Sequence, residues 1–197
     1  MASTLLIHDL IPNCEALGPG RRFVISVQGC SLRCPGCLVP GTHDPKKGRE
    51  VSVRELAERI LEEKDIDGIT LIGGEPMEQA RPLVELLEIV DQYANLSVFT
   101  YTGYTLRYLL EKKNTWQLRL LNASDMVCDG PFVLGKSADD LLWRGSANQR
   151  IYVFSESCRK QIENLREQVK MEFRRRGDRL QVMGVVDSGV MQLPLNT

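Results

Sequence analysis

The chain has 197 residues, of which 43% are hydrophobic and 26% charged, and its net charge is −1. This length and composition indicate a globular protein of one domain with a substantial core. The near-zero charge argues against nucleic acid or an anionic membrane as a general partner. Because the N-terminal stretch has no basic region or small-residue cleavage site, and no segment is apolar enough to span a bilayer, we expect a cytoplasmic protein.

Strand-like and helix-like segments alternate along the chain. Residues 21–29 alternate apolar and other side chains and are rich in β-branched types, which predicts a strand. Residues 52–64 predict a helix with one apolar face, and Ser52 with Glu55 suggests a capping box at its start. Further strands are predicted at residues 69–72, 96–103, 124–133, 149–155 and 179–186, and helices at 77–93, 105–113 and about 156–176.

This alternation predicts an α/β fold built from βαβ units around a mainly parallel sheet. No repeat, low-complexity tract or shift in composition marks a boundary, so we predict a single domain over residues 1–197. Its core is expected at about residues 18–155, with residues 156–197 as a C-terminal helix and strand extension. The longest irregular segments are residues 41–50 and 134–149, and the second is a candidate functional loop.

Three of the six cysteines, Cys30, Cys34 and Cys37, lie within eight positions directly after the first predicted strand. A disulfide framework is disfavoured by this uneven spacing, and metal or catalytic use is favoured. Thiolates select zinc, copper(I) or iron–sulfur clusters. A four-iron cluster held by three cysteines leaves one iron open to a ligand, so three are sufficient. The remaining cysteines are dispersed and are expected to be buried or of unassigned role: Cys14, Cys128 and Cys158.

One alternative keeps zinc, with His43 or Asp44 as the fourth ligand, although zinc loops more often pair two closely spaced couples of ligands. A second unusual segment, Gly73-Gly74-Glu75-Pro76, follows the second strand. Ligands of parallel α/β folds bind at the carboxyl ends of the strands, so both segments are expected at one edge.

The cysteine spacing with this glycine–glycine–glutamate turn resembles the radical S-adenosylmethionine (radical SAM) superfamily. The resemblance implies a partial (β/α) barrel, a [4Fe-4S] cluster on Cys30, Cys34 and Cys37, and S-adenosylmethionine at the open iron. It also implies that the turn, Gly73 to Pro76, receives the amino group of the methionine moiety. Glycines allow close approach of backbone, and Glu75 supplies a carboxylate for that group. Thr100, Tyr101 and Thr102, at the end of the third strand, are expected to line the cofactor site; packing is an equal alternative for Tyr101.

Longer segments are similar to a narrower family, the activating proteins of anaerobic ribonucleotide reductase. They are GPGRRFVISVQGCSLRCPGC, TYTGYT, VCDGPFV and WRGSANQRI, spread over residues 18–151. The resemblance implies reductive cleavage of S-adenosylmethionine to a 5′-deoxyadenosyl radical, which removes a hydrogen from a glycine of a large glycyl-radical enzyme. A flavodoxin- or ferredoxin-type electron donor is implied as well. Residues 38–41, Leu-Val-Pro-Gly, depart from the family's commoner Asn-Pro pattern, and residues 179–195 extend past a typical activase.

Two alternatives stay open: a small radical SAM enzyme acting on a small molecule or peptide, such as a carboxy-deazaguanine synthase, and a zinc-binding module without enzymatic activity. Several polar residues also have two interpretations. Arg144, Asn148, Gln149 and Arg150 are candidates to contact the adenosyl group or the partner, or to be solvated. Asp129 is a candidate for a ribose hydroxyl or for a turn cap. Residues 174–176 are a basic helix end that suits an acidic partner or solvent.

Overall fold

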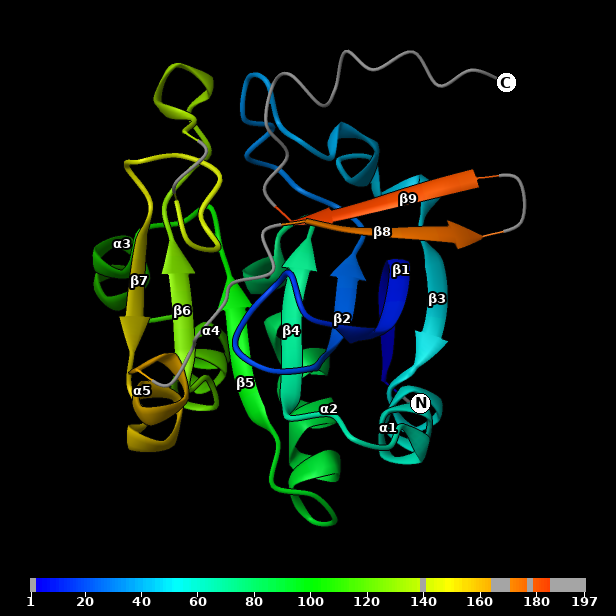
Figure 1. Ribbon diagram of the computed structural model, residues 1–197. Coiled ribbons are helices and arrows are strands. Elements are labelled where there is room, and N and C mark those ends of the chain that lie inside the picture. The colour runs from blue at the N-terminus through cyan, green and yellow to red at the C-terminus, as the bar shows by residue number, and fades with distance from the viewer. Residues whose placement is uncertain (1–2, 139–140, 164–170, 177–178, 185–197) are drawn as a thin grey trace.

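The structure is a computed structural model that describes residues 3–138, 141–163, 171–176 and 179–184 (Figure 1). The strands are β1 (Thr4–Cys14), β2 (Arg22–Val27), β3 (Arg49–Ser52), β4 (Gly68–Gly73), β5 (Ser97–Tyr101), β6 (Met126–Asp129), β7 (Arg150–Val153), β8 (Met171–Arg176) and β9 (Arg179–Gly184). The α-helices are α1 (Val53–Glu62), α2 (Ala80–Asp91), α3 (Leu106–Lys112), α4 (Thr115–Asn122) and α5 (Glu156–Glu163). Short 3-10 helices are η1 (Pro40–Thr42), η2 (Pro45–Lys47), η3 (Pro76–Gln79) and η4 (Leu134–Lys136).

A seven-stranded sheet in the order β3-β1-β2-β4-β5-β6-β7 forms the centre of the molecule. The pairs β2–β4, β4–β5 and β5–β6 are parallel, whereas β1–β2, β1–β3 and β6–β7 are antiparallel. The α/β class is confirmed, but the prediction of a mainly parallel sheet is wrong. The sheet is mixed because chain segments that lack a crossover helix add antiparallel strands to both edges of a parallel centre.

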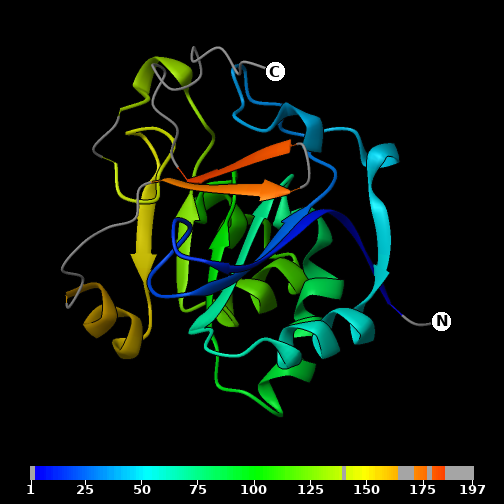
Figure 2. The same cartoon turned by 45° about the vertical axis from the view of Figure 1, so that its right-hand side comes forward.

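The parallel strands send alternate side chains to the two faces of the sheet. Phe23 and Ile25 join the main core against the helices, while Val24 between them joins a cluster on the opposite face. Figures 1 and 2 show α1, α2, α3 and α4 together on one face. The main core therefore fills the layer between these helices and the sheet.

The opposite face carries two smaller apolar clusters. One contains Cys14, and the other contains Cys128 and Cys158 with Phe99 and Trp143. Burial raises the pKa of the Cys14 thiol to about 11 and that of the Cys128 thiol to about 12. These cysteines are protonated packing side chains, as expected for Cys128.

The C-terminal elements differ from the predicted long helix. The helix α5 ends at Glu163, and residues 171–176 form β8, which pairs antiparallel with β9. The hairpin lies across the carboxyl end of the central strands (Figure 1). The Arg174 guanidinium donates to the backbone oxygens of Pro12 and Asn13 and pairs with Glu172, so it holds this hairpin to β1 instead of facing a partner.

The sequence analysis missed β1, β3 and α4, and it placed the start of α1 correctly for the wrong reason. No hydrogen bond from the Ser52 side chain caps α1. Instead, the Val53 N–H donates to the backbone oxygen of Ser3 at 3.0 Å. Because Ser52 also ends β3, neighbouring backbone satisfies the helix start and the capping box does not form.

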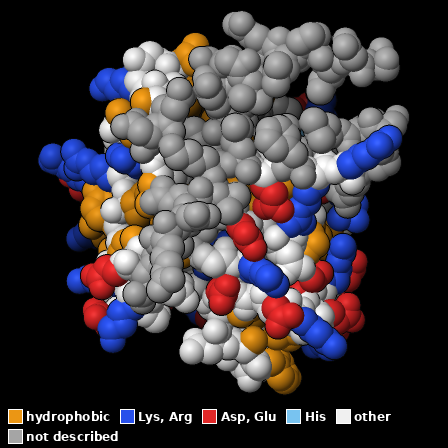
Figure 3. Space-filling model, viewed as in Figure 1, with side chains coloured by type: hydrophobic (Ala, Val, Ile, Leu, Met, Phe, Trp, Pro, Cys, Tyr) orange, Lys and Arg blue, Asp and Glu red, His pale blue; other side chains and the backbone are white. Residues whose placement is uncertain are grey.

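Charged side chains of both signs are mixed over the lower right of the face in Figure 3, and hydrophobic side chains gather over β7 at its left. Within the described residues, no helix has the length and apolar character needed to cross a membrane.

Candidate active site

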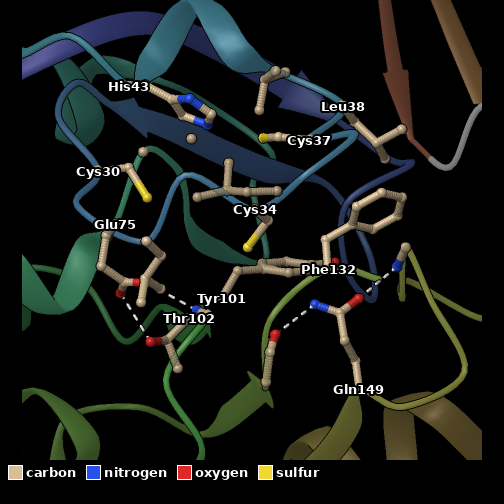
Figure 4. A pocket seen from close by; sticks show the side chains of 18 of the residues that line it. Cys30, Cys34, Cys37, Leu38, His43, Glu75, Tyr101, Thr102, Phe132 and Gln149 are labelled. Carbon is tan, nitrogen blue, oxygen red and sulfur yellow. Dashed lines mark hydrogen bonds between the residues drawn. The ribbon is translucent and has the colours of Figure 1, made fainter. Parts of the chain in front are cut away.

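The carboxyl ends of β2, β4, β5 and β6 surround one pocket (Figure 4). Residues at or just after the end of each strand line the pocket: Cys30, Cys34 and Cys37 for β2, Gly73 to Glu75 for β4, Tyr101 to Gly103 for β5, and Gly130 and Phe132 for β6. Trp143, Gly145 and Gln149 complete the side toward β7. The predicted meeting of the cysteines with the glycine–glycine–glutamate turn is confirmed.

The three cysteines lie on one loop and are half-buried free thiols. Burial raises the pKa of the Cys30 and Cys37 thiols above its usual value. Among the described residues, no group of three or more His, Cys, Asp and Glu side chains is arranged around a single metal ion. The Asp44 carboxylate accepts the Lys46 N–H at 3.0 Å as the cap of η2. Asp44, one of the two residues considered as a fourth zinc ligand, therefore already serves as a helix cap.

Gly73 and Gly74 let the turn after β4 approach the chain that enters the cysteine loop. A Cβ on Gly74 would lie 2.2 Å from the Gly29 backbone oxygen, and one on Gly73 would lie 2.4 Å from Ser26 Oγ. Gly73 also has φ +103, which L side chains rarely adopt. The Gly74 and Glu75 N–H groups donate to the backbone oxygens of Val27 (2.7 Å) and Gly29 (2.8 Å). Any larger residue would force the two segments apart.

The Glu75 side chain is 1% exposed and lies at the pocket wall. Its carboxylate accepts the Thr102 hydroxyl at 2.8 Å, the Gly103 N–H at 2.8 Å and the Met77 N–H at 2.9 Å. Burial raises its pKa from 4.5 to about 7 despite these donors. No ion pair to Glu75 occurs among the described residues. A buried carboxylate of this kind suits a ligand that brings further N–H donors.

Glu78, which the sequence analysis did not single out, ties the cysteine loop to η3. Its carboxylate accepts the Ser31 N–H at 3.1 Å, the Ser31 hydroxyl and the Tyr104 hydroxyl at 3.1 Å. The side chain of Gln79 likewise bonds the backbone of Leu6 and the Gln28 oxygen. No local pattern marks these roles, because each depends on partners more than 25 residues away.

Other predicted residues have partners within the protein. Thr100 is not part of the lining, and its hydroxyl bonds that of Ser124 at 2.8 Å. Pro76 is buried at the start of η3. Asp129 accepts the Leu106 N–H at 2.7 Å at the start of α3, so of its two predicted roles it has that of a cap.

Gln149 lines the pocket, but its polar atoms are used within the loop. Its amide donates to the Gly130 oxygen at 3.0 Å and accepts the Gly145 N–H at 2.8 Å (Figure 4). The Arg144 guanidinium donates to the Gln149 backbone oxygen at 3.3 Å, and the Asn148 side-chain amide donates to the Pro131 backbone oxygen at 2.7 Å. Arg150 is exposed on β7. These residues build the loop that closes this side of the pocket.

Comparison with known proteins connects this geometry to a family. The model of the 4Fe-4S single cluster domain matches residues 16–152. A protein of Vibrio cholerae named anaerobic ribonucleoside-triphosphate reductase-activating protein is 32% identical over 157 residues, covering 75% of this chain and 97% of that relative. The chain belongs to this 4Fe-4S activating-protein family.

Other members have similar coverage. The Pasteurella multocida protein of the same name is 34% identical over 147 residues, covering 71% of this chain and 91% of its own length. The protein of the same name from Enterobacteria phage T4 is 31% identical over 154 residues, with coverages of 74% and 92%. The family match includes the whole pocket edge up to β7, while β8 and β9 follow its last matched residue.

Proposed function

We propose that this protein is a radical SAM enzyme that installs a glycyl radical in anaerobic ribonucleoside-triphosphate reductase. The observation that carries the proposal is the convergence of the Cys30, Cys34 and Cys37 loop with the Gly73-Gly74-Glu75 turn at one strand edge. When bound, the [4Fe-4S] cluster and S-adenosylmethionine supply an electron and a 5′-deoxyadenosyl radical, which removes a hydrogen atom from a glycine.

The cysteines are assigned as the ligands of the cluster. Their half-buried thiols all border the pocket, and soft sulfur donors suit iron–sulfur clusters. Three ligands leave one iron for the cofactor. Glu78 holds Ser31, next to Cys30, against η3 and so keeps the loop in place.

The turn after β4 is assigned to the amino group of S-adenosylmethionine. The Glu75 carboxylate is oriented by Thr102 and Gly103, which follow the neighbouring strand β5, so the acceptor is positioned before the ligand arrives. Gly73 and Gly74 leave room for backbone approach, and Pro76 starts the rigid turn that follows. Thr100 is assigned to support this edge from within β5, where its hydroxyl bonds that of Ser124.

Tyr101 is assigned to the adenosyl side of the pocket. Its hydroxyl is buried without a hydrogen-bond partner in the described residues, although it lines the pocket. Burial also raises its pKa well above 10, so the hydroxyl stays protonated and can donate to a ligand. Its ring packs on Phe99 with centroids 4.5 Å apart, which fixes its direction.

The partner is proposed to cover the pocket mouth. Two exposed apolar side chains after the cysteines line it, Leu38 (36% exposed) and Val39 (45%), and the exposed Leu134 (62%) on η4 lies close to Gly36 of the same loop. When a protein surface covers these apolar side chains, water is excluded from a reactive radical in the pocket. A flavodoxin- or ferredoxin-type protein is proposed as the electron donor.

The same proposal includes a partial (β/α) barrel, supported by the four parallel strands with helices on one face. It includes one domain over residues 1–197, supported by the packing of Met183 with Ile11 and Val24. A cytoplasmic location is supported by the free thiols of all six cysteines, which suit a reducing compartment.

The test is anaerobic activation of the reductase. The reconstituted protein, S-adenosylmethionine and a reductant are mixed with anaerobic ribonucleoside-triphosphate reductase, and glycyl radical is quantified by electron paramagnetic resonance (EPR). We expect a radical with the native protein and with the matched control Cys128→Ala, and none with Cys37→Ala. Formation of 5′-deoxyadenosine without a glycyl radical would contradict the partner and favour a small-molecule or peptide substrate.

A further inference from the structure

His43 has a buried ring nitrogen that no described group of the protein satisfies. Its Nε2 atom has no hydrogen-bond partner, and the residue lines the pocket with Cys30 and Cys37. A buried polar group left unpaired is unfavourable, so it is expected to meet a ligand. The other histidine, His8, is exposed, and its Nδ1 is paired with the Gln28 side chain at 2.8 Å.

The backbone around His43 is fixed to the entrance of the cysteine loop. The Cys30 N–H donates to the His43 oxygen at 3.2 Å, and the Gly29 N–H donates to the Thr42 oxygen at 2.7 Å. The Gln28 amide donates to the backbone oxygens of Gly41 (2.8 Å) and Asp44 (2.7 Å). These hydrogen bonds, before and after His43 in the sequence, hold its backbone and therefore its ring beside the cysteine loop.

The direction of the ring indicates what it meets. Figure 4 shows the His43 ring turned toward the space between Cys30 and Cys37. No cysteine sulfur lies within hydrogen-bond reach of Nε2. Nε2 thus faces the volume that the proposed cluster would fill, and a partner there would be a sulfur of that cluster.

We propose that His43 donates a hydrogen bond from Nε2 to a sulfide of the [4Fe-4S] cluster. The inference rests on the proposed function, which assigns the cluster to Cys30, Cys34 and Cys37. His43 is then a positioning residue that adjusts the cluster, and it is not an iron ligand. Hydrogen bonds to the sulfurs of a cluster raise its reduction potential, because the reduced form carries more negative charge.

The first test compares His43→Phe with the matched control His8→Phe in the full-length reconstituted protein. Phenylalanine keeps a planar ring and removes the donor. An EPR-monitored redox titration of His43→Phe should show the reduction equilibrium about tenfold less favourable, a shift of about 59 mV to lower potential for one electron. The His8→Phe protein should titrate like the native one. An unchanged potential in His43→Phe would overturn the inference.

The second test does not depend on the folding of His43→Phe and uses protein labelled with 15N-histidine. Pulsed EPR of the reduced cluster should show a weak 15N coupling in the native protein that persists in His8→Phe. Absence of a 15N coupling would contradict the hydrogen bond. A strong coupling would contradict it as well and would indicate that a histidine binds iron directly. If the cluster cleaves S-adenosylmethionine but shows no histidine coupling, only the proposed hydrogen bond from His43 is contradicted. Failure to form a cluster removes the proposed function as well.

Discussion

A charged side chain is buried at each end of the parallel strands, Arg22 at the amino end and Glu75 at the carboxyl end, and the two are satisfied differently. Arg22, at the start of β2, is 0% exposed and donates five hydrogen bonds, one for each of its N–H groups. The acceptors are Thr70 Oγ1, Ser97 Oγ and the backbone oxygens of Pro19, Ile69 and Ser97. This guanidinium fastens the amino ends of β2, β4 and β5 and leaves no donor for a ligand.

Glu75, at the opposite end, accepts three hydrogen bonds and borders the pocket with its carboxylate. A carboxylate has about four acceptor positions, so capacity remains for a ligand. The comparison teaches that burial of a charge does not mark a binding site. A binding site is marked instead by a buried polar group whose hydrogen-bonding capacity is only partly used within the protein.

The largest expected effect is at the pocket edge itself. Replacing Cys34 with alanine removes one of three proposed cluster ligands, so iron content and 5′-deoxyadenosine formation should fall to background. Cys128→Ala, in the opposite packing cluster, should retain both. Iron and sulfide analysis after anaerobic reconstitution measures this difference, and equal loss in both variants would contradict the assignment.

At the amino ends, Arg22→Met should lower the free energy of unfolding by about 3–5 kcal/mol, because buried carbonyl groups lose their donors. The activity of the protein that remains folded should be unchanged. Arg107→Met is the control, since the Arg107 side chain is 87% exposed and pairs with Glu111 at 2.8 Å on the surface of α3; its effect should stay within about 0.5 kcal/mol. Urea denaturation gives both values, and an Arg22→Met protein that is folded but inactive would contradict a purely structural role for Arg22.

Glu75→Gln should weaken S-adenosylmethionine binding by about 10- to 100-fold, since a hydrogen bond to a charged group contributes about 1.5–3 kcal/mol. Its iron content should equal that of the native protein. The exposed Glu88→Gln serves as control. Equilibrium binding under anaerobic conditions provides the measurement, and native affinity in Glu75→Gln would rule out its assigned role.

The titration of Glu75 gives the smallest effect. Because burial raises its folded-state pKa to about 7, its contribution to stability is largest below 4.5 and is lost as pH rises through 7. Relative to Glu75→Gln, the protein without cofactors should lose on the order of 2 kcal/mol of unfolding free energy between pH 4.5 and 8. Urea denaturation across this range tests it, and a difference that does not vary with pH would show that Glu75 is well solvated.

The sequence predicted the elements whose signals are local. The cysteine spacing, the turn at Gly73 and the apolar periodicity of α1 can be read within a few residues, and the parallel strands follow from their β-branched runs. Their meeting at one edge followed from the general rule for parallel strands.

The rest depends on partners distant in sequence. Residues 171–176 include Met, Glu and Arg, which favour a helix, yet pairing with β9 makes this segment a strand. The strand β1 and the roles of Arg22, Glu78 and His43 depend in the same way on neighbours that only the folded chain brings together.

The most direct measurement of the central claim is low-temperature EPR of the dithionite-reduced, reconstituted protein before and after S-adenosylmethionine is added, with 5′-deoxyadenosine assayed in the same samples. The site predicts a reduced-cluster signal that changes on addition, together with 5′-deoxyadenosine. Absence of a cluster, or a signal unchanged by S-adenosylmethionine, would contradict the assignment of Cys30, Cys34, Cys37 and Glu75.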